Sequence, residues 1–127
     1  MSALRLPGDR RAAGAARPLS QAFARAKAER RAAFIPYITA GDPDLAATER
    51  LAIALAAAGA DILELGVPFS DPIADGPVNQ AAAARALASG TTLVGILALV
   101  ARLQPRLGIP IVLFTYFNPI HAYGVER

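Results

Sequence analysis

Three short β-forming runs that are separated by long helical stretches constrain the fold of this chain most strongly. The runs cover residues 33–39, 61–67 and 109–117, and they are rich in apolar, β-branched and aromatic side chains. Because helical patterns fill the segments between them, no two runs can be joined by a tight hairpin. Strands joined by helical crossovers lie parallel to one another. The sequence therefore predicts an α/β protein with a parallel sheet.

The expected helices are bounded by residues that cap or stop helices. Ser20 is placed to cap the first helix, Thr92 to cap the last, and Gly59 to stop the second. After the third strand, Asn118-Pro119 is expected to begin a turn or a helix. The helical segments are residues 21–31, 45–58, 78–88 and 92–103.

The number of strands leaves two parallel architectures open. Three strands fit either an open doubly wound sheet or part of a barrel, and periodicity alone does not separate them. No Gly-x-Gly-x-x-Gly dinucleotide fingerprint follows the first strand. If the architecture is a barrel, the 127 residues are about half of the ~250 that a TIM barrel typically contains.

Composition excludes several functional classes. The chain has no cysteine, which rules out a disulfide scaffold, a thiolate metal site and a cysteine nucleophile. Its longest apolar run, residues 93–100, is far shorter than the ~20 residues that span a bilayer. We therefore expect neither a membrane segment nor a need for an oxidising compartment, and the expected location is cytoplasmic.

Charge is unevenly distributed along the chain. Residues 1–31 hold eight basic and two acidic side chains, whereas the rest of the chain carries a net negative charge. Residues 1–19 are predicted to be a flexible basic leader. Because the basic stretch has a single aromatic residue and no binding motif, nucleic acid is not expected as a partner. An organelle transit peptide is the alternative, although the stretch has little serine and an early Pro7-Gly8-Asp9 turn.

Glu64 is the first candidate functional residue, because it lies inside an otherwise apolar strand. Loss of hydration penalises an unpaired carboxylate there and raises its pKa, so Glu64 must be paired, protonated or part of a site. Strand alternation places Ile62, Glu64 and Gly66 on one face. In a barrel Glu64 would point inward near the C-terminal end, where TIM-barrel active sites lie. A structural ion pair with a helix arginine is the alternative, and spacing does not decide between the two.

Two aspartates follow in the next loop. A structural role is the alternative for both Asp71 and Asp75. Aspartates in loops commonly form turns, and Asp75 could also cap the helix that begins near Gly76-Pro77. Three carboxylates near one strand end nevertheless favour a functional site over three unrelated structural roles.

This run of residues resembles the signature of tryptophan synthase alpha chains. In that signature a strand-end Glu leads through Gly-Val-Pro-Phe-Ser-Asp-Pro to Ala-Asp-Gly-Pro, and the resemblance extends from about Ser20 to the end of the chain. It implies that residues 20–127 form an incomplete domain, the N-terminal part of a (β/α)8 TIM barrel with about three of the eight strands present. The segments that carry it are residues 64–77, 34–43, 80–92, 109–111, Tyr116 and Asn118.

The resemblance implies a carbon–carbon lyase of tryptophan biosynthesis. The implied reaction is retro-aldol cleavage of indole-3-glycerol phosphate to indole and glyceraldehyde 3-phosphate, with no cofactor and no metal in this subunit. The family assigns the proton transfers to the Glu at the place of Glu64, and the indole nitrogen to the Asp at the place of Asp75. Tyr37, Phe114 and Tyr116 match positions that line the indole pocket, although they could equally be core residues.

The resemblance also implies a partner, the pyridoxal-phosphate-dependent tryptophan synthase beta subunit, in a heterotetramer. Asp71 and Asn118 match positions that face it. The phosphate-binding loops and the lid of the family have no counterpart in this sequence, so the chain alone is expected to be inactive. The alternatives are another phosphate-handling TIM barrel, a non-catalytic interaction module that binds the beta subunit, and a gene fragment without a function of its own.

Overall fold

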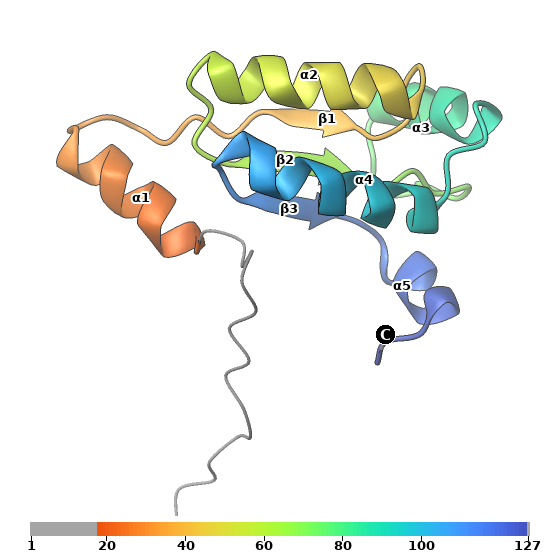
Figure 1. The fold of residues 1–127 in the computed structure, drawn as a ribbon. Coiled ribbons are helices and arrows are strands. Elements are labelled where there is room, and N and C mark those ends of the chain that lie inside the picture. Colours follow the sequence, from red (N-terminus) through yellow and green to blue (C-terminus); the bar gives the residue numbers. More distant parts are fainter. Residues whose placement is uncertain (1–17, 127) are drawn as a thin grey trace, which may run out of the picture.

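The computed structural model describes residues 18–126, which form a three-stranded parallel sheet with helices packed on one face (Figure 1). Most of the predicted leader and its Pro7-Gly8-Asp9 turn lie outside the described residues. The α/β class and the predicted order of strands and helices are confirmed. In chain order the elements are α1 (Leu19–Ala28), β1 (Tyr37–Thr39), α2 (Leu45–Ala57), β2 (Leu63–Gly66), α3 (Pro77–Ala88), α4 (Leu93–Leu107), β3 (Ile111–Phe114) and α5 (Phe117–Tyr123).

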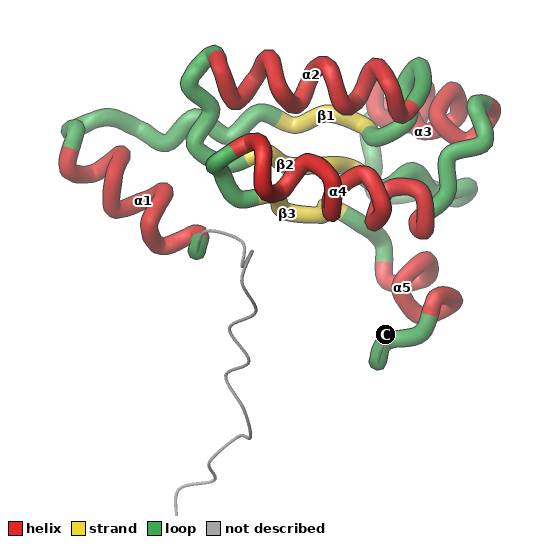
Figure 2. The backbone as a smooth tube through the Cα atoms, in the orientation of Figure 1, coloured by secondary structure: helices red, strands yellow, loops and turns green. Residues whose placement is uncertain are grey.

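The strand order of the sheet is that of a segment of a parallel barrel. Its order is β1-β2-β3, and both neighbouring pairs are parallel. The crossover helices α2 and α4 pack side by side on one face of the sheet (Figure 2). A doubly wound sheet reverses its strand order and carries helices on both faces, whereas a barrel keeps its strands sequential and its helices outside. The arrangement therefore favours the N-terminal part of a TIM barrel over the open sheet.

The core lies between the sheet and the outer helices. Leu63 and Leu65 of β2 and Ile96, Leu99 and Leu103 of α4 are all fully buried. The three α4 residues repeat at intervals of three and four, so they form one apolar stripe that faces the sheet. Burial of each such side chain stabilises the fold by roughly 1.5–3 kcal/mol. The outer side of this sheet is therefore packed without any contribution from further strands.

The helix boundaries follow local chemistry but differ from the predicted ones at several ends; α1, for example, ends at Ala28 rather than at residue 31. Ser20 does not cap the first helix, because α1 begins at Leu19 after Pro18 and places Ser20 in its first turn. The Thr92 hydroxyl does cap α4, accepting a hydrogen bond from the Gly95 N–H at 3.1 Å. This helix runs four residues further than predicted, to Leu107.

The strands are shorter than the β-forming runs that predicted them. Prolines 36 and 110 stand just before β1 and β3, and Pro68 lies two residues beyond β2. Proline has no N–H to give to a ladder, so it confines regular pairing to the residues between. Each strand therefore keeps three or four paired residues, all of them within the predicted runs.

Asp61, just before β2, is a buried carboxylate whose role the sequence did not reveal. Its oxygens accept hydrogen bonds from Arg31 Nη2 at 2.8 Å, Arg25 Nη2 at 2.6 Å and the Phe34 N–H at 2.8 Å. Arg31 foremost, then Arg25 and the Phe34 N–H, hold the pKa of the Asp61 carboxyl well below its ordinary value. The cluster attaches α1 to the N-terminal end of the sheet.

Replacing Asp61 with asparagine is expected to destabilise the chain more at neutral pH than in acid. Because the folded-state pKa of Asp61 lies below the ordinary value of 3.8, only the unfolded chain binds this proton as the pH falls below about 4. The stabilisation is therefore present above about pH 5 and is lost as the pH falls toward the folded-state pKa. Urea unfolding of both chains at about pH 7 and about pH 3 measures this; an equal difference at the two pH values would contradict it.

Candidate active site at the C-terminal end of the strands

The face of the sheet opposite α2 and α4 carries Glu64. In the parallel register Glu64 pairs with Tyr37 of β1 and Val112 of β3, so these side chains lie on the same face. The neighbours Leu63 and Leu65 are buried on the other face, as strand alternation predicted. Glu64 itself is partly exposed rather than buried, since no element of residues 18–126 covers its face fully. Among the ion pairs of residues 18–126, none includes Glu64, so the predicted alternative of a helix arginine partner is not observed there.

An aromatic wall stands beside Glu64. The ring of Tyr37 lies over Gly66, where an added Cβ would come within 2.6 Å of Tyr37 Cζ. Phe114 of β3 meets the same ring edge to face, with centroids 5.9 Å apart and planes at 89°. Gly66 therefore makes room for the Tyr37 ring, and the Tyr37 and Phe114 rings, which the sequence proposed as pocket walls, are neighbours across β2.

Tyr116 anchors the loop that follows β2. Its hydroxyl accepts a hydrogen bond from the Ala74 N–H at 3.0 Å, and its ring packs on Phe69 with centroids 5.1 Å apart. The Gln80 amide of α3 fixes the same loop, donating to the Asp75 carbonyl oxygen at 2.8 Å. The sequence proposed Tyr116 as a pocket wall or a core residue, and no local pattern could have shown that it holds a loop 42 residues away in the chain.

Asp75 lies on the cavity that Phe114 and Tyr116 help to form. This cavity of about 220 Å³ is lined by Asp75 together with Ala74, Phe114, Thr115 and Tyr116. The predicted alternative role of Asp75 as a helix cap is wrong, because α3 starts at Pro77 and its N-cap is Gly76. The structure thus brings Asp75 and the aromatic wall beside Glu64 to the same end of the sheet.

The loop after β1 is held to α3 by a charged pair. The Arg85 guanidinium donates to both carboxylate oxygens of Asp42, at 2.8 and 2.7 Å. These hydrogen bonds lower the pKa of Asp42 and raise the pKa of Arg85. Since α3 begins two residues after Asp75, this pair links the loops that follow β1 and β2.

Asp71 and Asn118 are exposed at the same end of the sheet. The Asp71 carboxylate accepts a hydrogen bond from the Ser70 hydroxyl at 2.7 Å, and Asn118 lies in α5. Neither residue lines the cavity of Asp75. Their proposed place in a partner interface stays a prediction.

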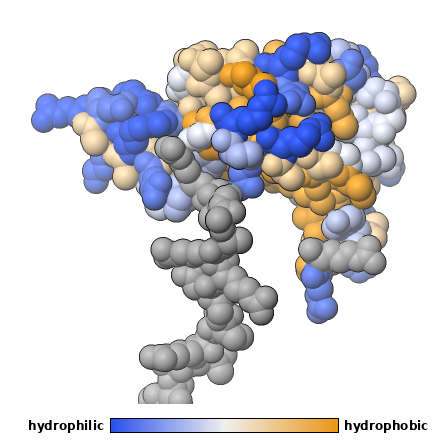
Figure 3. Space-filling model, in the orientation of Figure 1, coloured by the Kyte–Doolittle hydropathy of each residue, from blue (hydrophilic) through white to orange (hydrophobic). Residues whose placement is uncertain are grey.

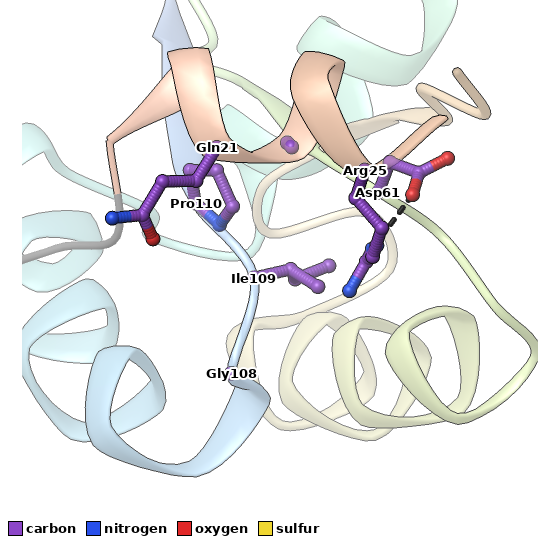
Figure 4. A pocket seen from close by; sticks show the side chains of 7 residues that line it. Gln21, Arg25, Asp61, Gly108, Ile109 and Pro110 are labelled. Atoms are coloured by element: carbon purple, nitrogen blue, oxygen red, sulfur yellow. Dashed lines mark hydrogen bonds and ion pairs between the residues drawn. The ribbon is translucent and has the colours of Figure 1, made fainter. Parts of the chain in front are cut away.

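A second pocket lies at the opposite, N-terminal end of the sheet, beneath α1 (Figure 4). It measures about 210 Å³, and Arg25 points across it to Asp61. Arg25 forms an ion pair with the buried carboxylate of Asp61. The active sites of parallel barrels lie at the C-terminal end of the strands, which is the opposite end. We therefore assign this pocket no part in the chemistry of Glu64 and Asp75.

No single helix among residues 18–126 is long and apolar enough to cross a membrane. Together α3 and α4 reach the required length and apolarity, but the pair is bent by 95° at its break. Ile96, Leu99 and Leu103, which supply much of that apolarity, are buried against the sheet.

Comparison with known proteins gives a consistent result. Residues 23–127 match the family described as tryptophan synthase alpha chain. The alpha chain of Citrifermentans bemidjiense is 58% identical over 109 residues, and that of Arabidopsis thaliana is 54% identical over 109 residues. Each match covers 86% of this chain but only 41% and 40% of the relatives. The chain thus spans about two fifths of the length of these relatives.

Solved structures agree with the sequence relatives. Tryptophan synthase subunit alpha from Legionella pneumophila is 42% identical and superposes with a TM-score of 0.81, covering 85% of this chain and 42% of that one. Tryptophan synthase from M. tuberculosis in an aminoacrylate-bound form is 40% identical, with a TM-score of 0.80, and covers 85% of this chain and 44% of that one. These neighbours are TIM barrels, which confirms the predicted fold class.

Proposed function

Because the chain belongs to the tryptophan synthase alpha chain family, we propose that it carries the acid–base half of a lyase active site. The reaction is the cleavage of indole-3-glycerol phosphate to indole and glyceraldehyde 3-phosphate. The observation that supports this proposal is that Glu64 and Asp75 lie at one end of the sheet, near the same aromatic residues. Phe114 contacts Tyr37, the strand partner of Glu64, and lines the cavity of Asp75.

Glu64 is proposed to move both protons of the cleavage. Protonation of indole carbon 3 makes that carbon a leaving group, and loss of the proton from the adjacent glycerol hydroxyl forms the aldehyde. The electrons of the broken carbon–carbon bond return to the ring and restore neutral indole. A partly exposed carboxyl beside aromatic rings can give one proton and take the other in turn. General acid–base groups suffice for these steps, so the proposal needs no cofactor or metal.

Asp75 is proposed to stabilise the charge that develops on the ring. Protonation at carbon 3 gives an indolenine with positive charge at nitrogen, and a nearby carboxylate lowers the energy of that state more than it lowers the energy of neutral substrate. Tyr37 and Phe114 supply apolar surface for the indole. The two acids therefore have separate roles, proton transfer and charge stabilisation.

The partner of the completed enzyme is proposed to be the pyridoxal-phosphate-dependent beta subunit, in a cytoplasmic complex. Asp71 and Asn118 are exposed and lie outside the Asp75 cavity, so they are free to face a second protein while substrate is bound. Asp71 and Asp75 lie in the same loop, so separate substitutions of the two residues can distinguish partner binding from catalysis.

Replacing Asp75 with asparagine is expected to lower kcat/KM by roughly 100-fold, because the amide keeps the shape but loses the charge. The enzyme to test is a completed barrel, this chain fused to the part of the C. bemidjiense alpha chain that follows its match. Asp71→Asn in the same loop is the matched control; it should leave indole release unchanged and weaken beta subunit binding. Equal turnover by the two variants would contradict the assignment of Asp75.

A further inference from the structure

The side chain of Gln80 closes the turn that carries Asp75. Residues 72–75 form this turn, in which the Asp75 N–H donates to the Pro72 carbonyl at 3.1 Å. The Gln80 Nε2 group donates to the Asp75 carbonyl at 2.8 Å and to the Pro72 carbonyl at 3.3 Å. A primary amide has two N–H donors, so one side chain can hold both ends of the turn. The position of Asp75 therefore depends on a side chain from the helix that follows its loop.

The carboxylate of Asp75 has no charged partner to hold it. It forms no ion pair within residues 18–126. Its backbone is held on both sides instead, by Gln80 at the Asp75 carbonyl and by the Tyr116 hydroxyl at the Ala74 N–H. These backbone hydrogen bonds therefore decide where the carboxylate lies.

The helix that carries Gln80 is attached to the fold mainly by polar contacts. The buried residues of α3 are all alanines, whose methyl groups bury little apolar area. The two hydrophobic clusters of the described core contain residues of the strands, α2 and α4 but none of α3. In Figure 3, hydrophobic surface gathers where α4 and α5 meet. The placement of α3 therefore relies on its hydrogen bonds and its ion pair.

These contacts join the last turns of α3 to the loop after β1. The Arg85 guanidinium binds both carboxylate oxygens of Asp42, a geometry that fixes direction as well as distance. The Ser89 hydroxyl donates to the Gly41 carbonyl at 3.1 Å. The helix is thus anchored near its C-terminal end, and Gln80 near its N-terminal end holds the turn of Asp75 from a fixed position.

We propose that Gln80 is a positioning residue, which aims the Asp75 carboxylate at the substrate ring by closing the turn of residues 72–75. This inference rests on the proposed function of Asp75. The carboxylate stabilises a charge that appears only when the ring is protonated, so its displacement lowers kcat and leaves KM nearly unchanged.

Gln80→Glu in the completed barrel keeps the shape of the side chain and removes its donors. At neutral pH the new carboxylate only accepts hydrogen bonds, and it would face two carbonyl oxygens. We expect kcat for indole release to fall by roughly 10-fold, with KM within about twofold of wild type. Asn79→Asp is the matched control, because it adds the same charge one residue earlier on α3 and Asn79 takes no part in closing the turn. Equal losses of kcat in the two variants would overturn the proposal.

The Asp75→Asn background shows whether Gln80 acts through Asp75. Once the carboxylate is gone, Gln80→Glu should lower kcat by less than about twofold, because the two residues act as one unit. A general structural role would give the same loss in both backgrounds. A further ~10-fold loss in the Asp75→Asn barrel would therefore overturn the proposal.

Amide hydrogen exchange separates a failure of this inference from a failure of the proposed lyase. In the folded completed barrel, exchange of the Ala74 N–H should accelerate about fivefold in Gln80→Glu and stay unchanged in Asn79→Asp, because the first variant alone loosens the turn. Unchanged exchange in Gln80→Glu would overturn the role of Gln80 even if the barrel releases indole. Accelerated exchange in a barrel that releases no indole would support the role of Gln80 in holding the turn and contradict the lyase.

Discussion

Glu64→Gln in the completed barrel is expected to lower kcat for indole release by roughly 10³-fold, because the amide can neither give nor take the proton that the cleavage requires. Glutamine preserves the size of the side chain. Glu64 makes no ion pair among residues 18–126, so its replacement should leave the fold intact. The loss should therefore appear in turnover and not in stability.

The matched control for this variant is Glu49→Gln. Glu49 lies on α2 at the outer layer, where its carboxylate accepts a hydrogen bond from Arg106 Nη1 at 2.5 Å. Glu49→Gln weakens the surface ion pairs of Glu49 with Arg106 and Arg102, which are of small energetic value, and should leave kcat unchanged. Steady-state kinetics give kcat for both variants, and circular dichroism confirms that each variant is folded. A kcat for Glu64→Gln within about threefold of wild type would remove Glu64 from the mechanism.

Gly41→Ala is expected to destabilise the chain by about 3 kcal/mol, the sum of backbone strain and overpacking. Gly41 follows β1 with a φ of +89°, which side chains other than glycine rarely adopt, and an added Cβ would collide with Thr91. The loop cannot move aside easily. The Gly41 N–H donates to Thr48 Oγ1 at 2.9 Å, and its carbonyl accepts from Ser89 Oγ at 3.1 Å.

Two other glycines separate the two causes. Gly59 has a φ of +97° but no atom within 4 Å of an added Cβ, so Gly59→Ala should cost only the strain, about 1 kcal/mol. Gly76 has neither a positive φ nor a near neighbour, so Gly76→Ala should cost only the weaker N-cap that alanine gives α3, about 0.5 kcal/mol. Urea unfolding of the three variants gives the order. Equal losses at Gly41 and Gly59 would show that Thr91 yields and that the loop is not rigid.

The periodicity of apolar residues predicted the helices and strands of this fold, because the residues within each element largely determine its type. Alternation in β2 put Glu64 and Leu65 on opposite faces, as observed. The Asp75 cap failed for a local reason that the sequence contained: Pro77 favours the first helical position, which makes Gly76 the N-cap and leaves Asp75 outside. The Ser20 cap failed because α1 starts one residue earlier, at Leu19, which places Ser20 in the first turn.

Contacts between distant segments could not be read from the sequence. The Arg25 and Arg31 pairs with Asp61 span 36 and 30 residues, and the Arg85 pair with Asp42 spans 43. Periodicity predicts which face a residue takes but not which residue it meets across the fold. The proposed chemical roles of the carboxylates come from the signature around Glu64, because periodicity carries no information about chemistry.

Indole release from indole-3-glycerol phosphate by the completed barrel tests the central claim most directly. Wild-type residues 1–127 fused to the remainder of the C. bemidjiense chain should release indole and glyceraldehyde 3-phosphate in equal amounts, whereas the 127-residue chain alone should release neither. A folded fusion that binds indole-3-glycerol phosphate but releases no indole would contradict the claim that this chain carries the acid–base half of the site.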